Sequence, residues 1–269
     1  MAIKGSGIAP GQVASGVPEA KVLTAKNGVP IWRKESLDFH LSLIQQGKDV
    51  SPLDYPGSQQ ALQKATDIVN LKDTVAIFGS IIPWVESIAH HNGAKSPTVT
   101  VDYNQPVSYD NRMKTELMSF MLESDTQFDV AISYSSIEHD GQGRHGDPLD
   151  PDGDLAAMKE VWLKVVPGGF LLVNVPMNEN DNFFGVSMRT YGPSRLPILI
   201  RGWEYGGLAT SEKVYGSKEK FDIKKVFAES PFLILRKPET VGVDDVLDTT
   251  KFGSLRCDRK SKICGAMSE

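Results

Sequence analysis

Gly79, Ser80 and Asp102 are the residues whose types and spacing first suggest chemistry in this chain. Gly79 and Ser80 follow the apolar run VAIF, and Asp102, followed by Tyr103, ends the next such run, TVTVD. An acidic residue about 20 residues after a glycine turn can hydrogen-bond the hydroxyl pair of a ribose. These four residues therefore predict a nucleoside site. The alternative is that Gly79 only forms a turn, because glycine also allows a sharp bend or a closely packed helix.

The residues after this glycine favour one cofactor over another. A dinucleotide fold needs a second glycine in the loop, because the pyrophosphate lies against it. Ile81 and Ile82 occupy those positions here. S-adenosylmethionine carries no phosphate, so its loop needs less room, and we expect this cofactor rather than NAD. The alternative is an α/β domain that has lost its ligand.

A second polar group follows the apolar run FDVAISY, and it begins with Ser135 and Ser136, which we expect to contact the cofactor. His139 and Asp140 come next, where an acceptor would lie. Methyl transfer requires a positioned acceptor and, for many acceptors, removal of a proton. Histidine can take up that proton near neutral pH, so His139 is the candidate base and Asp140 the residue that orients it. The alternative for His139 is a structural hydrogen bond under the loop.

The loop that follows is rich in charged residues. Arg144, His145 and Asp147 could recognise a hydroxylated or anionic acceptor, although His145 could also be an exposed loop residue. The segment DPLDPDGD suggests a calcium loop, but the EF-hand pattern fails because Val161 stands where its last glutamate is required. A divalent ion held by Asp140, Asp147 and Asp152 stays open. We expect no metal. These acidic residues would instead stabilise tight turns, and Asp154 would cap the next helix.

Residues 182–207 form an aromatic segment that is broken by glycine and proline. It could close over an acceptor, with side chains suited to stacking and to bidentate bonding of a sugar or a carboxylate. The four side chains concerned are Arg189, Tyr191, Arg195 and Trp203. The alternative is a packed connection with Trp203 in the core.

Alternating strands and helices must position these residues. The apolar, β-branched segments predict a mostly parallel sheet covered by helices. The expected strands are 74–80, 98–103, 128–136, 170–176 and 232–238. The expected helices are 59–71 with Ser58 as its cap, 83–94, 111–124 and 154–166. In such a sheet a ligand binds beyond the carboxyl ends of the strands.

Two segments resemble the class I S-adenosylmethionine-dependent methyltransferases. Their fourth strand often reads F-D-x-V-x-S followed by L-E-H, and L-K-P-G-G precedes their fifth. Here the matching residues are Phe128, Asp129, Ser133, Glu138, His139, Leu163, Lys164, Pro167, Gly168 and Gly169. The resemblance implies a Rossmann-like class I methyltransferase fold, a mostly parallel sheet with helices on both faces.

Further motifs are similar to a methyltransferase-like family of unknown function first described from nematodes. Its members share GS-x-x-PW, an acidic-Tyr-Asn strand end, S-x-x-S-x-EHDG and GRxGDPxxPDGD. These motifs begin here at Gly79, Asp102, Ser133 and Gly143. The resemblance covers residues 58–240 and implies a fold and a cofactor but no settled substrate. The acidic residue near the adenine on a third strand has no clean counterpart; Asp110 and Asp125 are both candidates.

Composition bounds the class of protein. The net charge is -5, with 29 basic and 34 acidic residues, so we expect no nucleic-acid partner. The chain has two cysteines, whose pairing stays open, and no apolar stretch long enough to span a membrane. Without the apolar core of a signal peptide in residues 1–20 we expect a cytoplasmic protein, although a removed signal segment stays open. We expect three parts: a lead-in and irregular cap (1–57), the Rossmann-like domain (58–240) and a polar tail (241–269).

The expected function is methyl transfer from S-adenosylmethionine to an oxygen or nitrogen of a small polar acceptor, for example a carbohydrate. One alternative is an inactive methyltransferase-like binding or scaffold protein, suggested by the single glycine in the loop. Another is a metal-assisted enzyme that uses the Asp-rich loop 147–154. The sequence leaves the acceptor and the oligomeric state open.

Overall fold

A computed structural model describes most of the chain between residues 23 and 240. The described residues are 23–24, 28–52, 57–71, 74–95, 97–143, 145, 147–183, 188–192, 194–219 and 230–240. The predicted tail 241–269 lies outside them, with both cysteines. Among the described residues, none of the helices combines the length and the apolar character that crossing a membrane requires.

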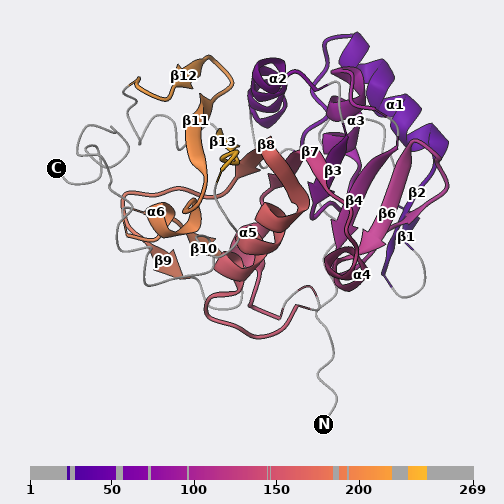
Figure 1. The fold of residues 1–269 in the computed structure, drawn as a ribbon. Helices are drawn as coiled ribbons and strands as arrows, with labels where there is room; N and C mark the ends of the chain where they lie inside the picture. The colour runs from indigo at the N-terminus through magenta and orange to yellow at the C-terminus, as the bar shows by residue number, and fades with distance from the viewer. Residues whose placement is uncertain are drawn as a thin grey trace.

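A single large sheet runs through the centre of the molecule (Figure 1). Its strands are β3 (Val75–Phe78), β4 (Thr98–Asp102), β6 (Met113–Leu117), β7 (Phe128–Tyr134), β8 (Val165–Asn174), β11 (Glu204–Ala209), β12 (Val214–Gly216) and β13 (Phe232–Arg236). Their order across the sheet is β12-β11-β13-β8-β7-β3-β4-β6. The pairs among β6, β4, β3, β7 and β8 are parallel, whereas β13 is antiparallel to both β8 and β11.

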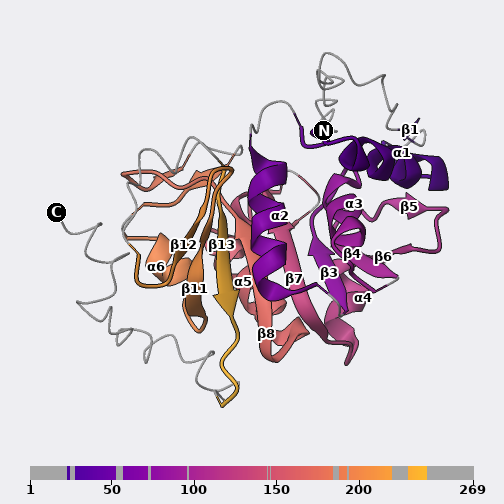
Figure 2. The same cartoon turned by 90° about the horizontal axis from the view of Figure 1, so that it is seen from above.

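Helices cover both faces of this sheet (Figures 1 and 2). The helices are α1 (Lys34–Gln45), α2 (Ser58–Val69), α3 (Trp84–His91), α4 (Met118–Glu123), η1 (Ile137–His139), α5 (Gly153–Lys164) and α6 (Leu196–Leu199). Alternate residues of β3 face different layers: Val75 and Ile77 pack with α2 and α3, whereas Ala76 and Phe78 pack with α4 and α5. The predicted mostly parallel sheet with helices on both faces is therefore confirmed.

The strand order reverses beside β3. The chain adds β4 and β6 on one side of β3 and then returns to add β7 and β8 on the other. Ligands of doubly wound sheets bind beyond the carboxyl ends of the strands at such a reversal. Gly79 follows β3 and Ser135 follows β7, so the fold places both at this edge.

The prediction of one helix over 111–124 was wrong. The structure divides this segment into β6 and the short helix α4. All five residues of β6 pair in register with β4, from Thr98↔Met113 to Asp102↔Leu117. Backbone pairing with a neighbouring strand therefore outweighs the helix propensity of Met, Lys, Glu and Leu in this segment.

The segment before residue 57 is more regular than predicted. It contains α1, which packs against α3, and the strands β1 (Leu23–Thr24) and β2 (Pro30–Trp32), which form a small sheet with β5 (Val107–Ser108). The buried Trp32 indole donates to the Ile81 carbonyl oxygen at 3.0 Å. The segment thus holds the loop that follows Gly79, so the irregular cap was a wrong prediction. The described chain also contains β9 (Asn182–Phe183) and β10 (Arg189–Thr190).

Candidate functional site

Ser80 and Asp102 meet at the carboxyl edge of the sheet. The Ser80 amide donates to Asp102 Oδ2 at 3.2 Å, and the Asn104 amide donates to Oδ1 at 2.7 Å. Burial raises the pKa of Asp102 above its ordinary value. Two strand ends distant in sequence therefore share one partly buried carboxylate, as the spacing predicts.

The backbone conformation and the packing at position 79 require a glycine even without a ligand. Its φ is +76°, a left-handed conformation, and a Cβ at this position would overlap the Ser136 hydroxyl and Cβ. Ser136 thus packs directly against the glycine. The turn interpretation accounts for Gly79, so the case for a ligand rests on Asp102 and its surroundings.

Replacing Gly79 with alanine should therefore destabilise the fold by about 1–3 kcal/mol, from the left-handed backbone and the overlap with Ser136. In the Gly79→Ala background, Ser136→Gly should recover part of this loss, because it removes the overlap but not the backbone strain. Urea unfolding of the two variants and the wild type measures both effects. An unchanged midpoint for Gly79→Ala would show that this turn is not formed as described.

A buried carboxyl group lies directly under the loop. Glu86, on α3, accepts hydrogen bonds from Ser80 Oγ at 3.2 Å and Thr100 Oγ1 at 2.7 Å. Its side chain is fully buried, and burial raises its pKa to about 7. Sequence reasoning missed this residue, whose signal was a lone glutamate among the apolar residues of PWVESIA. Glu86 links the loop after β3 to strand β4.

Glu86→Gln should change how stability depends on pH. Protonated Glu86 contributes stability that is fully present below pH 4.5 and is lost as the pH rises through about 7. The wild type should therefore lose about 3 kcal/mol relative to the Gln variant between pH 4.5 and pH 8. Urea unfolding of both proteins at these two pH values tests this, since other carboxyl groups titrate alike in both. Parallel stability curves would contradict the buried, protonatable Glu86.

His139 ends the short helix η1 and is 17% exposed at its side chain. Its Nε2 lies 3.7 Å from Glu138 Oε1, and its ring meets that of His145 edge-on, with 5.5 Å between centroids. Burial raises the pKa of Glu138 to about 7, and within the part of the chain that the structure describes its buried Oε2 has no hydrogen-bond partner. An ionised Glu138 would stabilise a protonated His139 ring.

Asp140 stands among other carboxylates. Burial, together with Asp147 and Glu160, raises its pKa to about 8. Ser135, predicted to contact a cofactor, donates its hydroxyl to Glu138 Oε1 at 2.6 Å and has a φ of 44°. The structure thus gathers Ser135, His139 and Asp140 at one turn, and Glu138 is the carboxylate that it places beside His139.

The Asp-rich loop uses its carboxylates internally. Asp147 accepts the amides of Gly143 at 2.8 Å and His145 at 3.0 Å, while Asp150 accepts the Asp152 amide at 2.9 Å. Arg144 lies outside the described residues. Within the described residues, His, Cys, Asp and Glu form no group of three or more able to hold a metal ion. The loop acids therefore have structural partners.

Asp154 does not cap α5. Its carboxylate lies in the first turn and is fully buried, where it accepts the Tyr191 hydroxyl at 3.0 Å and Arg195 Nε at 2.9 Å. Trp203 is buried in the core. Tyr191, Arg195 and Trp203 therefore form the packed connection that was the alternative to an acceptor lid.

The fourth side chain from that segment, Arg189, holds the loop around His139. Its buried guanidinium donates to four backbone carbonyl oxygens, those of Glu138, Asp140, Asp150 and Pro151. Arg189 thus ties the turn that carries His139 to the start of α5. Arg189 is therefore a positioning residue, which directs these hydrogen bonds to the backbone.

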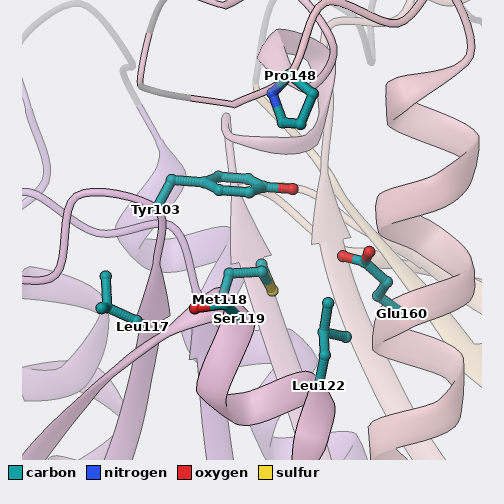
Figure 3. Close-up of a pocket in the computed structure, with 7 residues that line it drawn as sticks. All are labelled: Tyr103, Leu117, Met118, Ser119, Leu122, Pro148 and Glu160. Carbon is teal, nitrogen blue, oxygen red and sulfur yellow. The ribbon is translucent and has the colours of Figure 1, made fainter.

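A cavity of about 240 Å³ is lined by Tyr103, the residue that follows Asp102 (Figure 3). Seven residues line it, namely Tyr103, Leu117, Met118, Ser119, Leu122, Pro148 and Glu160. Tyr103 directly follows β4, whereas Leu117 ends β6 and the next residues belong to α4. Sequence reasoning found Tyr103 but missed the other walls, because it placed residues 117–122 inside a longer helix.

Comparisons with known proteins give one family and several solved structures. The family described as "Caenorhabditis protein of unknown function, DUF268" matches residues 72–237. No curated protein matches the chain.

Three solved structures illustrate the structural likeness. The N1-methyltransferase for 1,6-didemethyltoxoflavin from Burkholderia thailandensis has 15% identity and a TM-score of 0.49 over 76% of this chain and 87% of that one. The N-methyltransferase NodS from Bradyrhizobium japonicum has 11% identity and a TM-score of 0.41, over 76% of this chain and 98% of that one. Human N-acetylserotonin methyltransferase has 13% identity and a TM-score of 0.43, over 83% of this chain and 61% of that one.

Proposed function

The chain belongs to the family described as "Caenorhabditis protein of unknown function, DUF268", and we propose that it is an S-adenosylmethionine-dependent methyltransferase. The proposal proceeds from this family and from the Rossmann-like class I methyltransferase fold of the chain. The acceptor is an oxygen or nitrogen of a small polar molecule, for example a sugar. One observation carries the proposal: the Asp102 carboxylate accepts the Ser80 amide, in the loop that follows β3 at the strand-order reversal, and the next residue, Tyr103, lines the cavity.

The residues present fit the nucleoside part of this cofactor. Each oxygen of Asp102 accepts one backbone amide and, as a carboxylate oxygen, has a further lone pair for a ribose hydroxyl. Tyr103 and the apolar side chains of α4 offer surfaces on which a base can lie. Gly79, Ser80, Ser135 and Ser136 are proposed to form the remaining edge of the cofactor site.

When bound, S-adenosylmethionine supplies an electrophilic methyl group. His139 is the proposed base, which takes the acceptor's proton onto its ring, and Glu138 stabilises the resulting charge from 3.7 Å. Asp140, Arg144 and Asp147 are proposed to contact the acceptor. For Asp147 this contact competes with the backbone amides of Gly143 and His145.

Methyl transfer from a labelled donor to a panel of sugars, amines and carboxylates tests the proposal. Label should appear in at least one acceptor with the wild type, and His139→Ala should lower turnover while leaving binding of S-adenosylhomocysteine intact. If the folded chain binds neither S-adenosylmethionine nor S-adenosylhomocysteine, the proposal fails.

Ser136 favours a second candidate function, a binding or scaffold protein on the same fold. Its side chain occupies the space beside Gly79. Under this candidate the chain binds the nucleoside or a partner but transfers no methyl group. Tight binding of S-adenosylhomocysteine without turnover across the whole panel would support this function over the first.

A further inference from the structure

We propose that Glu160, on helix α5, recognises the exocyclic amino group of the cofactor's adenine and so determines that the cavity takes adenine. This inference rests on the proposed function, because it concerns the base of S-adenosylmethionine. From the sequence, the candidates for this contact are Asp110 and Asp125.

The cavity has the composition of a base site. Figure 3 shows the Tyr103 ring lying above Met118 and Ser119, while the Glu160 carboxylate points from α5 towards the space between them. Most of the lining is apolar or aromatic, and Glu160 is the only charged group among the lining residues. Ligand sites typically combine apolar walls with a few polar groups that fix orientation.

Glu160 has an unused acceptor atom. Its Oε2 is buried and has no hydrogen-bond partner among the described residues, and burial raises the pKa of this carboxyl group. A buried acceptor without a donor is unfavourable, because it has lost its hydrogen bonds to water. A ligand that brings an N–H group to Glu160 removes this cost, and the amino group of adenine is such a donor.

The other carboxylates near β6 lie away from the cavity or are paired with a basic side chain. Asp110 precedes β6, away from the carboxyl end, and Arg112 bonds both of its oxygens at 2.6–3.1 Å. Asp125 follows α4 and precedes β7, so it lies before the next strand begins. Glu116, on β6 itself, pairs with Lys114 at 2.6 Å. Among the carboxylates considered for this contact, only Glu160 lines the cavity.

The contact predicts a preference that can be measured without catalysis. A carboxylate accepts a hydrogen bond from the 6-amino group of adenine but repels the 6-oxo group of hypoxanthine. A site built to bond one substituent rejects an analogue that lacks it, because the buried group is then left unpaired. Glutamine at position 160 could donate to the 6-oxo group through its amide.

Calorimetric titration with S-adenosylhomocysteine and its 6-oxo analogue, S-inosylhomocysteine, tests this. The wild type should bind the adenine ligand roughly tenfold to a hundredfold more tightly. In Glu160→Gln the two affinities should come within about threefold. Glu123→Gln, an exposed glutamate on α4, is the matched control and should keep the wild-type ratio.

Each contrary result has a distinct meaning. Equal affinities of the wild type for the two ligands, or a wild-type ratio in Glu160→Gln, would overturn the role of Glu160 while the proposed cofactor stands. The first of these needs no variant, so it applies even if Glu160→Gln fails to fold. Absence of binding by either ligand to the folded wild type would overturn both the inference and the proposed function.

Discussion

Asp102→Ala is expected to weaken binding of S-adenosylhomocysteine by about a hundredfold or more. The substitution removes a charged acceptor for the ribose hydroxyls, and such hydrogen bonds contribute about 1.5–3 kcal/mol each. It also releases the Ser80 amide, which donates to Asp102 at 3.2 Å, so the loop after β3 loses an anchor. Calorimetric titration of the variant and the wild type measures the change.

Two comparisons separate the ribose contact from the loop anchor. Asp102→Asn keeps an oxygen that can accept the Ser80 amide but loses the charge, so it should fold like the wild type and still bind weakly. His139→Ala should keep wild-type affinity. If Asp102→Ala and His139→Ala lose binding equally, the separate roles assigned to these residues are wrong.

Arg189→Met is expected to lower the free energy of unfolding by about 3–5 kcal/mol. The guanidinium is buried, 3% exposed as a residue, and donates to four backbone carbonyl oxygens of the segment 138–151. Methionine fills much of the volume but leaves these acceptors without a donor. The turn that carries His139 should also loosen, so turnover should fall with stability.

Arg236→Met is the matched control for this variant. Arg236 forms exposed ion pairs with Glu204 and Glu239, and such solvent-screened pairs contribute little to stability. Urea unfolding at one pH compares the three proteins. A loss of under 1 kcal/mol for Arg189→Met would show that the carbonyl groups find water instead, and that the loop does not depend on Arg189.

The sequence predicted the parts of the site that depend on strand ends. Apolar, β-branched runs followed by Gly79 and Asp102 determine where β3 and β4 end, and parallel pairing then brings those ends together. The convergence of Ser80 and Asp102 needs only this local information. The same reasoning placed Ser135 and His139 after β7.

Residues whose role depends on packing between distant elements were missed. Glu86 looked like one polar residue on an apolar helix, and its partner Thr100 lies on another strand. Arg189 suggested an acceptor contact because arginine binds carboxylates well, but the fold directs it to backbone carbonyls. The cavity that Glu160 lines has further walls from the end of β6 and from α4, which replace the predicted single helix. Side-chain direction across elements is set by tertiary packing, which periodicity does not encode.

The most direct test of the account is a calorimetric titration of S-adenosylhomocysteine into the full chain. The account predicts one saturable site per chain, with affinity that falls sharply in Asp102→Ala while the variant remains folded. A flat titration with folded wild-type protein, or binding that is indifferent to the loss of Asp102, would contradict the claim that the edge between β3 and β4 is a nucleoside site.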